Sequence, residues 1–133
     1  MLGDFTWNVI EKDMEGLAKR FKITSRNLAN ANTPGYERRN MSFEDELRDV
    51  MNSTGKLKMI VTDTRHIPTR PASVKDVTPA ELKIKDEVYR LDGNNVDPER
   101  EMAVLAETRM MYGAMSRLAA RKLANYRSVI SGR

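Results

Sequence analysis

Apolar residues recur at alternating steps of three and four over two long stretches, one at each end of the chain. The first stretch, in which only Thr24 is polar, comprises Trp7, Ile10, Met14, Leu17, Phe21, Thr24, Leu28 and Ala31. The second, looser stretch comprises Met102, Leu105, Tyr112, Met115, Ala119, Leu123, Tyr126 and Ile130. This spacing places the apolar side chains on one face of an α-helix and is typical of helices that pack against another helix. The chain is therefore predicted to be mainly α, with long N- and C-terminal helices.

Local signals set the ends of these helices. The first helix is expected from about residue 4 to residue 32, because Pro34 cannot continue a helix and Gly35 tolerates positive φ. Pro34 and Gly35 also suit the central positions of a type II turn. The last helix is expected from Pro98 to about residue 128 or beyond, with Asp97 as its N-cap.

The region between the long helices is less regular. A short helix is predicted over residues 43–52, with Ser42 and Asp45 at capping-box spacing. Alternation predicts a strand over residues 57–62, and a second strand over 84–91 that pairs with it in a possible β-hairpin. We therefore expect residues 1–35 and 92–133 to form one coiled-coil-like domain. Residues 36–91 would be a small intervening segment with a short helix and an irregular or β part.

The distribution of charge favours an antiparallel arrangement of the terminal helices. Acidic residues lie in the first half of the first helix, and basic residues fill its second half. The last helix likewise begins acidic, with Glu99, Glu101 and Glu107, and is basic thereafter. Each exposed ion pair is worth only about 0–1 kcal/mol, but several together select one orientation. The prediction is an antiparallel helical hairpin, formed within one subunit or between subunits.

Composition narrows the class of protein. The 133 residues are 40% hydrophobic and 32% charged, with no cysteine and a net charge of +4. The sequence therefore offers no disulfide and no thiolate metal site. No apolar run approaches the roughly 18 residues of a transmembrane helix, and the first residues do not resemble a cleaved secretory signal. The small basic excess is interpreted as a mixed solvated surface, with nucleic-acid binding as the alternative.

The residues that usually carry chemistry form no convincing site. The single histidine, His66, has no partner for a histidine metal pair. Asp92, Asn94 and Asp97 resemble part of a calcium loop, but Ala103 stands where an EF-hand needs its glutamate. We therefore expect no catalytic, cofactor-binding or metal-binding residues, no cofactor and no enzymatic activity.

Two motifs next to the long helices carry a family resemblance. The segment Asn27-Leu28-Ala29-Asn30-Ala31-Asn32-Thr33-Pro34-Gly35-Tyr36 resembles the signature that follows the N-terminal helix of bacterial flagellar rod and hook proteins. The segment Asp92-Gly93-Asn94-Asn95-Val96-Asp97 resembles the matching signature before their C-terminal helix. The order and positions of the motifs and the chain length are most similar to the proximal-rod subgroup, as is the stretch from Thr62 to Pro68.

The resemblance implies a non-enzymatic structural subunit of the flagellar basal body. Such subunits leave the cell through the flagellar type III export apparatus without a cleaved signal. They polymerise through their terminal helices into the rod that transmits torque from the membrane ring to the hook. The implied location is the periplasmic part of the rod where an outer membrane exists.

The resemblance also implies partners. These are copies of the chain itself, the other proximal-rod proteins, the adaptor between ring and rod, the membrane-supramembrane ring and a rod-cap scaffold. Nucleic acid and direct membrane insertion are not expected. The alternatives are another subunit of the rod and hook family or, from a different class, a basic helical nucleic-acid-binding module.

Particular residues are expected to carry these roles. Asn30, Asn32, Pro34 and Gly35 should shape the exit from the first helix, and Gly93, Asn94, Asn95 and Asp97 the entry to the last. The expected assembly seam consists of Ile10, Met14, Leu17, Phe21, Leu28, Leu105, Tyr112, Met115, Leu123 and Tyr126.

Overall fold

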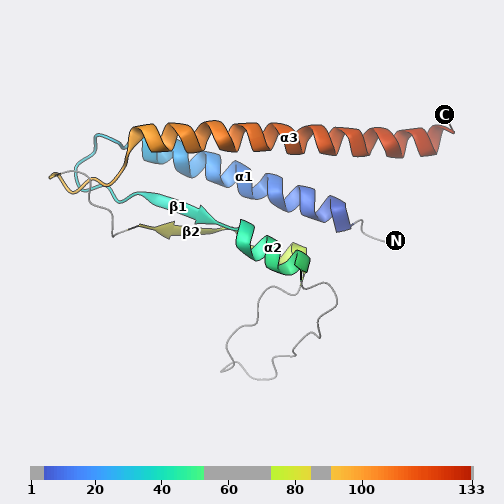
Figure 1. Cartoon of the computed structure of the whole chain (residues 1–133), viewed down its shortest axis with the longest axis horizontal. Helices are drawn as coiled ribbons and strands as arrows, with labels where there is room; N and C mark the ends of the chain where they lie inside the picture. Colours follow the sequence, from blue (N-terminus) through green and yellow to red (C-terminus); the bar gives the residue numbers. More distant parts are fainter. Residues whose placement is uncertain (1–4, 53–72, 85–90, 133) are drawn as a thin grey trace, which may run out of the picture.

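The computed structural model describes residues 5–52, 73–84 and 91–132. The elements in chain order are α1 (Phe5–Ala29), β1 (Arg39–Ser42), α2 (Glu44–Asn52), the 3₁₀ turn η1 (Val74–Asp76), β2 (Ala80–Lys83) and α3 (Pro98–Ser131). Figure 1 shows α1 and α3 side by side in opposite directions, with β1, β2 and α2 on the other side of α1. The predicted mainly α fold with an antiparallel terminal hairpin is confirmed. No helix in the described ranges is long and apolar enough to span a bilayer.

The long helices begin and end close to the predicted positions. The Asp97 side chain accepts hydrogen bonds from the backbone N–H groups of Glu99 and Arg100, so it is the predicted N-cap of α3. Helix α1 ends at Ala29, earlier than expected, and passes into a turn. The Tyr36 N–H then bonds to the Thr33 carbonyl at 3.3 Å across Pro34 and Gly35. Gly35 has a φ of 68°, which position three of a type II turn requires.

The small sheet differs from the predicted hairpin. Strands β1 and β2 pair antiparallel, with Arg39 opposite Lys83 and Ser42 opposite Ala80. Most of the strand predicted over 84–91 lies outside the described residues; at its two described ends, Ile84 follows β2, which ends at Lys83, and Leu91 lies in a turn. The prediction for 57–62 concerns residues outside the described ranges. Sequence reasoning missed β1 because its four residues contain a single buried side chain, Met41, which is too short a pattern to recognise.

The apolar core lies between α1 on one side and β1, α2 and η1 on the other. One cluster joins Leu17 and Ile23 to Met41 and Phe43, with Met115 of α3 at its edge. A second cluster, with Val9 of α1 against it, consists of Leu47, Val50, Val74 and Val77. Helix α3 contributes little to either cluster, so one side of α1 carries most of the core.

Phe43 fixes the contact between α1 and α2. Its ring lies over Gly16, where an added Cβ would come within 2.4 Å of a ring carbon. The guanidinium of Arg20 lies 5.3 Å from the ring centroid and also pairs with Glu44. The Phe43 carbonyl accepts the Leu47 N–H at 2.9 Å, so Phe43 is the residue that precedes α2. The predicted cap, Ser42, instead belongs to β1.

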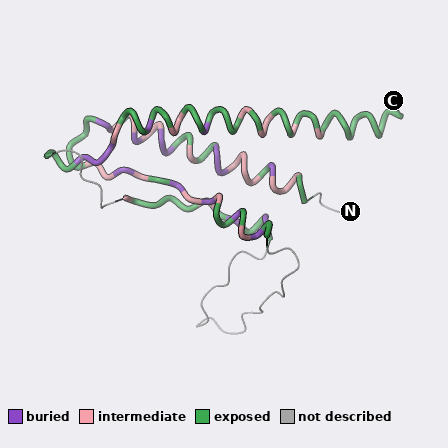
Figure 2. The backbone as a smooth tube through the Cα atoms, in the orientation of Figure 1, coloured by how far each residue is buried: buried purple, intermediate pink, exposed green. Residues whose placement is uncertain are grey.

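Burial along α3 is uneven. Glu101 and Thr108 are its buried residues, and both lie in the first third of the helix. Figure 2 shows the remainder of α3 mostly exposed up to its C-terminal end. Helix α3 is therefore held against α1 near its N-terminus and is exposed over most of its length.

Candidate functional site

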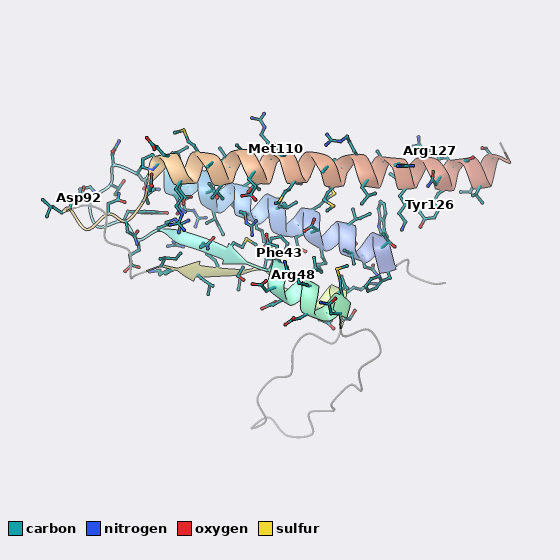
Figure 3. The ribbon with its side chains drawn as sticks, in the orientation of Figure 1. Phe43, Arg48, Asp92, Met110, Tyr126 and Arg127 are labelled. Atoms are coloured by element: carbon teal, nitrogen blue, oxygen red, sulfur yellow. The ribbon has the colours of Figure 1, made fainter. Side chains whose placement is uncertain are left out.

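The two sequence motifs meet at the end of the hairpin where α1 exits and α3 begins. Figure 3 shows Asp92 at this end, far from Tyr126 and Arg127. Asn94 lies at the centre and is fully buried. Its side-chain N–H groups donate to the carbonyls of Asn30 (2.9 Å), Ala31 (3.0 Å) and Thr33 (2.8 Å). A helix C-terminus leaves carbonyls without intrahelical partners, and Asn94 satisfies those that follow α1.

The backbone of the second motif is shaped to present Asn94. The Asn94 N–H donates to the Asp92 carboxylate at 3.1 Å, and the Asn94 side-chain oxygen accepts the Val96 N–H at 2.8 Å. The Gly35 N–H donates to the Asp92 carbonyl at 3.0 Å. Gly93 has a φ of 77°, and a Cβ on it would lie 3.7 Å from the Gly35 Cα. The glycines of the two motifs therefore lie next to each other.

Asn27, the first residue of the first motif, is the second polar centre of this junction. Its N–H groups donate to the Arg39 carbonyl at 2.7 Å and to the Glu101 carboxylate at 3.0 Å. Its side-chain oxygen accepts the Arg39 N–H at 3.1 Å and the Tyr36 hydroxyl at 3.3 Å. Both donors and both lone pairs of the amide are thus in use. Asn27 joins α1 to β1 and to α3.

A buried ion pair completes the junction. Arg38 Nε donates to a Glu101 carboxylate oxygen at 2.6 Å, and the two side chains are 5% and 1% exposed. Asn95 accepts the Arg38 N–H at 2.5 Å and donates to the Ile84 carbonyl at 2.6 Å. Arg38 Nη1 has no hydrogen-bond partner among the described residues. Two charges removed from water are tolerated only as a pair, so this contact fixes the start of α3 against β1.

We name the set Asn27, Arg38, Asn94, Asn95 and Glu101 the polar clasp. Sequence reasoning identified its three asparagines through the motifs but missed the ion pair. The sequence pattern groups Glu101 with the acidic residues that begin the last helix and places Met102 on the apolar stripe. In the structure the environments of these two residues are the opposite of those expected: Glu101 is buried and Met102 is half-exposed. Glu101 precedes the buried Thr108 by seven residues, and that heptad phase was the available signal.

The other motif residues surround the clasp. Asn30 donates from its side chain to the Arg26 carbonyl at 2.8 Å, just after the last turn of α1. Val96 is buried, and Tyr36 is partly buried. Seven of the motif residues are exposed: Ala29, Asn32, Thr33, Pro34, Gly35, Asp92 and Gly93.

The expected seam residues divide into groups by exposure. Ile10 and Leu17 are buried, whereas Met14, Leu28, Leu105 and Met115 are partly buried. Four others are 41–45% exposed: Phe21, Tyr112, Leu123 and Tyr126. Near the middle of the hairpin a groove of about 280 Å³ opens between α1 and α3, lined by Leu17, Ala18, Phe21, Thr108, Arg109 and Tyr112. Within one chain, therefore, only part of the expected seam is buried.

Two surface carboxylates, Glu81 and Glu15, have pKa values lowered by their ion pairs. Glu81 accepts from Arg39 at 2.6 Å and Arg26 at 3.4 Å, and the Arg39 hydrogen bond lowers the pKa of Glu81. The same contact raises the pKa of Arg39. Hydrogen bonds from Lys19 and then Lys12 lower the pKa of Glu15.

The pKa of Asp13 is shifted in the opposite direction. Its partial burial raises its pKa, and the neighbouring Glu44 adds to that shift while Arg20 opposes it. Within residues 5–52, 73–84 and 91–132, no three acidic or histidine side chains gather in a way that could hold a metal ion. His66 lies outside those ranges.

Comparison with known proteins places the chain in a family. A family profile described as "Flagella basal body rod protein" matches residues 14–36, which include the first motif. The chain is 34% identical to the flagellar basal body rod protein FlgB of Salmonella typhimurium over 125 residues, covering 86% of this chain and 85% of that protein. It is 35% identical to the Escherichia coli FlgB over 99 residues, covering 71% and 70%. The Bacillus subtilis FlgB is 31% identical over 111 residues, covering 84% and 81%. The chain belongs to the FlgB family of flagellar basal body rod proteins.

Proposed function

We propose that this chain is a structural subunit of the proximal rod of the bacterial flagellum, assembling through its terminal helices into the shaft between membrane ring and hook. The family supports the rod assignment. The observation that carries the mode of assembly is the exposed apolar surface of α3, which includes Met110, Leu118, Leu123, Val129 and Ile130. Exposed apolar patches of this kind mark interaction surfaces.

Under this proposal the two parts of the chain have different roles. Residues 1–35 and 92–133 form the helical part that packs in the inner core of the rod. Residues 36–91 form a small supporting segment, since the core clusters place β1, α2 and η1 against α1. A shaft that carries torque needs close-packed helices, and the polar clasp supplies a fixed geometry for each pair of helices.

The proposed partners follow from the location in the rod. They are copies of this chain, the other proximal-rod proteins, the adaptor between ring and rod, the membrane-supramembrane ring and a rod-cap scaffold. Delivery is through the flagellar export apparatus, and the place of assembly is the periplasm where an outer membrane exists. The subunit acts by packing and performs no catalysis.

One basic pair in the sequence, Arg38 and Arg39, is not available for nucleic-acid binding. Arg38 is buried against Glu101, and Arg39 is paired with Glu81. Neither guanidinium is therefore presented as a free cation for phosphate, which is the main source of affinity for nucleic acid.

The test compares two exposed leucines in a swimming strain whose only copy of the gene encodes the variant. Leu123→Asp changes the exposed seam on α3, whereas Leu82→Asp changes a similarly exposed position on β2. We expect Leu123→Asp to abolish swimming and to leave basal bodies without a completed rod, and Leu82→Asp to swim normally. Leu17 is unsuitable, because it is 1% exposed and its substitution would unfold the chain. Normal rods in the Leu123→Asp strain would overturn the proposed mode of assembly.

A further inference from the structure

A second, shorter apolar stripe lies on the middle of α3, beside the one that faces α1. We name as the outer stripe the exposed residues Met111, Ala114 and Leu118. Each lies one residue before a member of the α1-facing set, which here is Tyr112, Met115 and Ala119. One residue rotates the side chain by about 100° around a helix axis. The outer stripe therefore points to one flank of the α1–α3 pair and is left uncovered by α1.

The groove between α1 and α3 opens on the opposite flank. On α3 it is lined by Thr108, Arg109 and Tyr112. Arg109 follows the buried Thr108 by one residue, so it is rotated by about 100° in the other sense. On α1 the groove is lined by Leu17, Ala18 and Phe21, which are all apolar. One molecule thus carries a ridge of apolar side chains on one flank and an apolar groove on the other.

We propose that the outer stripe of one copy of this chain docks into the α1–α3 groove of the next copy. The proposal rests on the proposed function, since it takes self-assembly as given and names the surfaces that meet. The flexible side chain of Met111, next to the small Ala114, suits insertion into a groove formed by other side chains. Charge agrees with this pairing, because Glu107 lies one turn before Met111 on the stripe and Arg109 lines the groove.

The placement of the surfaces on opposite flanks determines the kind of assembly. After two copies meet, one still has a free groove and the other a free stripe. A two-fold dimer would need both surfaces to face the same partner at once, which their opposite directions prevent. The contact is therefore heterologous and adds further copies in the same sense, as a ring or helical assembly requires.

Disulfide trapping tests the contact directly, because the 133-residue chain contains no cysteine. Met111→Cys labels the outer stripe, and Ala18→Cys labels the groove. The matched control is Met110→Cys, since Met110 is also exposed but lies one residue away, on a different face. Each variant is purified, checked for wild-type helicity by circular dichroism, and oxidised alone or in a 1:1 mixture.

The expected result is a mixed disulfide dimer of Met111→Cys with Ala18→Cys at several times the yield of either variant alone. The mixture of Met110→Cys with Ala18→Cys should stay at the background yield. Equal yields with Met110→Cys and Met111→Cys would overturn the proposal, as would a dominant Met111→Cys homodimer or no trapping above background. Any of these results would leave the rod function untouched, because that function is judged independently by swimming and rod completion.

Charge reversal provides a second measurement that uses no cysteine. Glu107→Arg and Arg109→Glu should each reduce self-association in sedimentation velocity, because each places like charges at the contact. The double variant should recover it, since every contact is then reversed together. Failure of the double variant to associate better than both single variants would argue against the pairing of these surfaces.

Discussion

The two ends of the α1–α3 hairpin differ in their side chains: one end buries polar residues, and the other exposes apolar residues. At the end near Asp97, buried polar and charged side chains hold the helices together, with Asn94 and Glu101 almost completely enclosed. At the other end, α3 exposes Val129 and Ile130, which are 82% and 86% accessible. Buried polar groups must find specific partners, so they define one geometry. Exposed apolar side chains do not define a single geometry until a partner covers them. The helix packing is thus fixed at one end of the hairpin, and apolar surface remains available for assembly at the other.

The largest expected effect is at the buried ion pair. Glu101→Ala leaves the Arg38 guanidinium buried without its carboxylate and should reduce the free energy of unfolding by about 3–5 kcal/mol. The matched control is Glu99→Ala, which removes an exposed carboxylate from the same helical turn and should cost less than about 1 kcal/mol. Urea unfolding followed by circular dichroism measures both. Equal losses for the two variants would show that the junction is not held by this pair.

A smaller loss is expected at the cap of α1. Asn94→Ala removes the donors to three carbonyls and the acceptor for the Val96 N–H, at an expected cost of about 1–3 kcal/mol. Asn52→Ala, at the exposed end of α2, is the control and should change stability by less than about 0.5 kcal/mol. Hydrogen exchange of the Val96 amide adds a local measurement. Unchanged protection of that amide in Asn94→Ala would contradict the capping role.

Replacing each of two helical glycines by alanine should change the stability of the chain in opposite directions. Gly16→Ala places a Cβ against the Phe43 ring and should destabilise through overpacking, by about 1–3 kcal/mol less the roughly 1 kcal/mol gained in helix propensity. At Gly113 the nearest atom to an added Cβ is Arg117 Nη1 at 3.6 Å, so Gly113→Ala should stabilise the chain by about 1 kcal/mol. Thermal unfolding of both variants tests the contrast, and stabilisation by Gly16→Ala would mean that Phe43 does not pack there.

The smallest effect concerns Asp13. Its raised pKa means that the folded chain binds this proton more tightly than the unfolded chain does. The ionised carboxylate therefore costs stability at neutral pH, and the cost disappears as pH falls through the raised pKa. Asp13→Asn should stabilise the chain at pH 7 by less than about 1 kcal/mol, because the group is half-exposed. The difference in unfolding free energy between variant and wild type should shrink toward acid pH, and a difference that grows there would contradict this sign.

Periodicity and capping signals predicted the long helices well, because both depend on residues close in the chain. Asp97 caps α3 through its own neighbours at positions 99 and 100, and Pro34-Gly35 forms its turn locally. The sheet could not be predicted in the same way. Its strands are separated by 37 residues, and the four residues of β2 are all exposed, so neither strand carries a clear alternating pattern.

The polar clasp likewise contains some residues that the sequence indicated and others that it did not. The motifs marked Asn27, Asn94 and Asn95 as important, but nothing near Arg38 in the chain indicated that its partner lies 63 residues away. A charged residue in a helical first turn is usually solvated, and only the packing of α3 across α1 and β1 removes Glu101 from water.

By itself the sequence determined where the chain is helical, where each long helix begins or ends, and which motifs relate it to flagellar rod proteins. These properties follow from helix geometry, capping and turn chemistry, which act over a few residues. The tertiary structure decided which polar residues are enclosed and which apolar stripe of α3 remains open. Burial depends on what lies opposite a side chain in space, and for Arg38, Glu101 and Met111 that is set by distant parts of the chain.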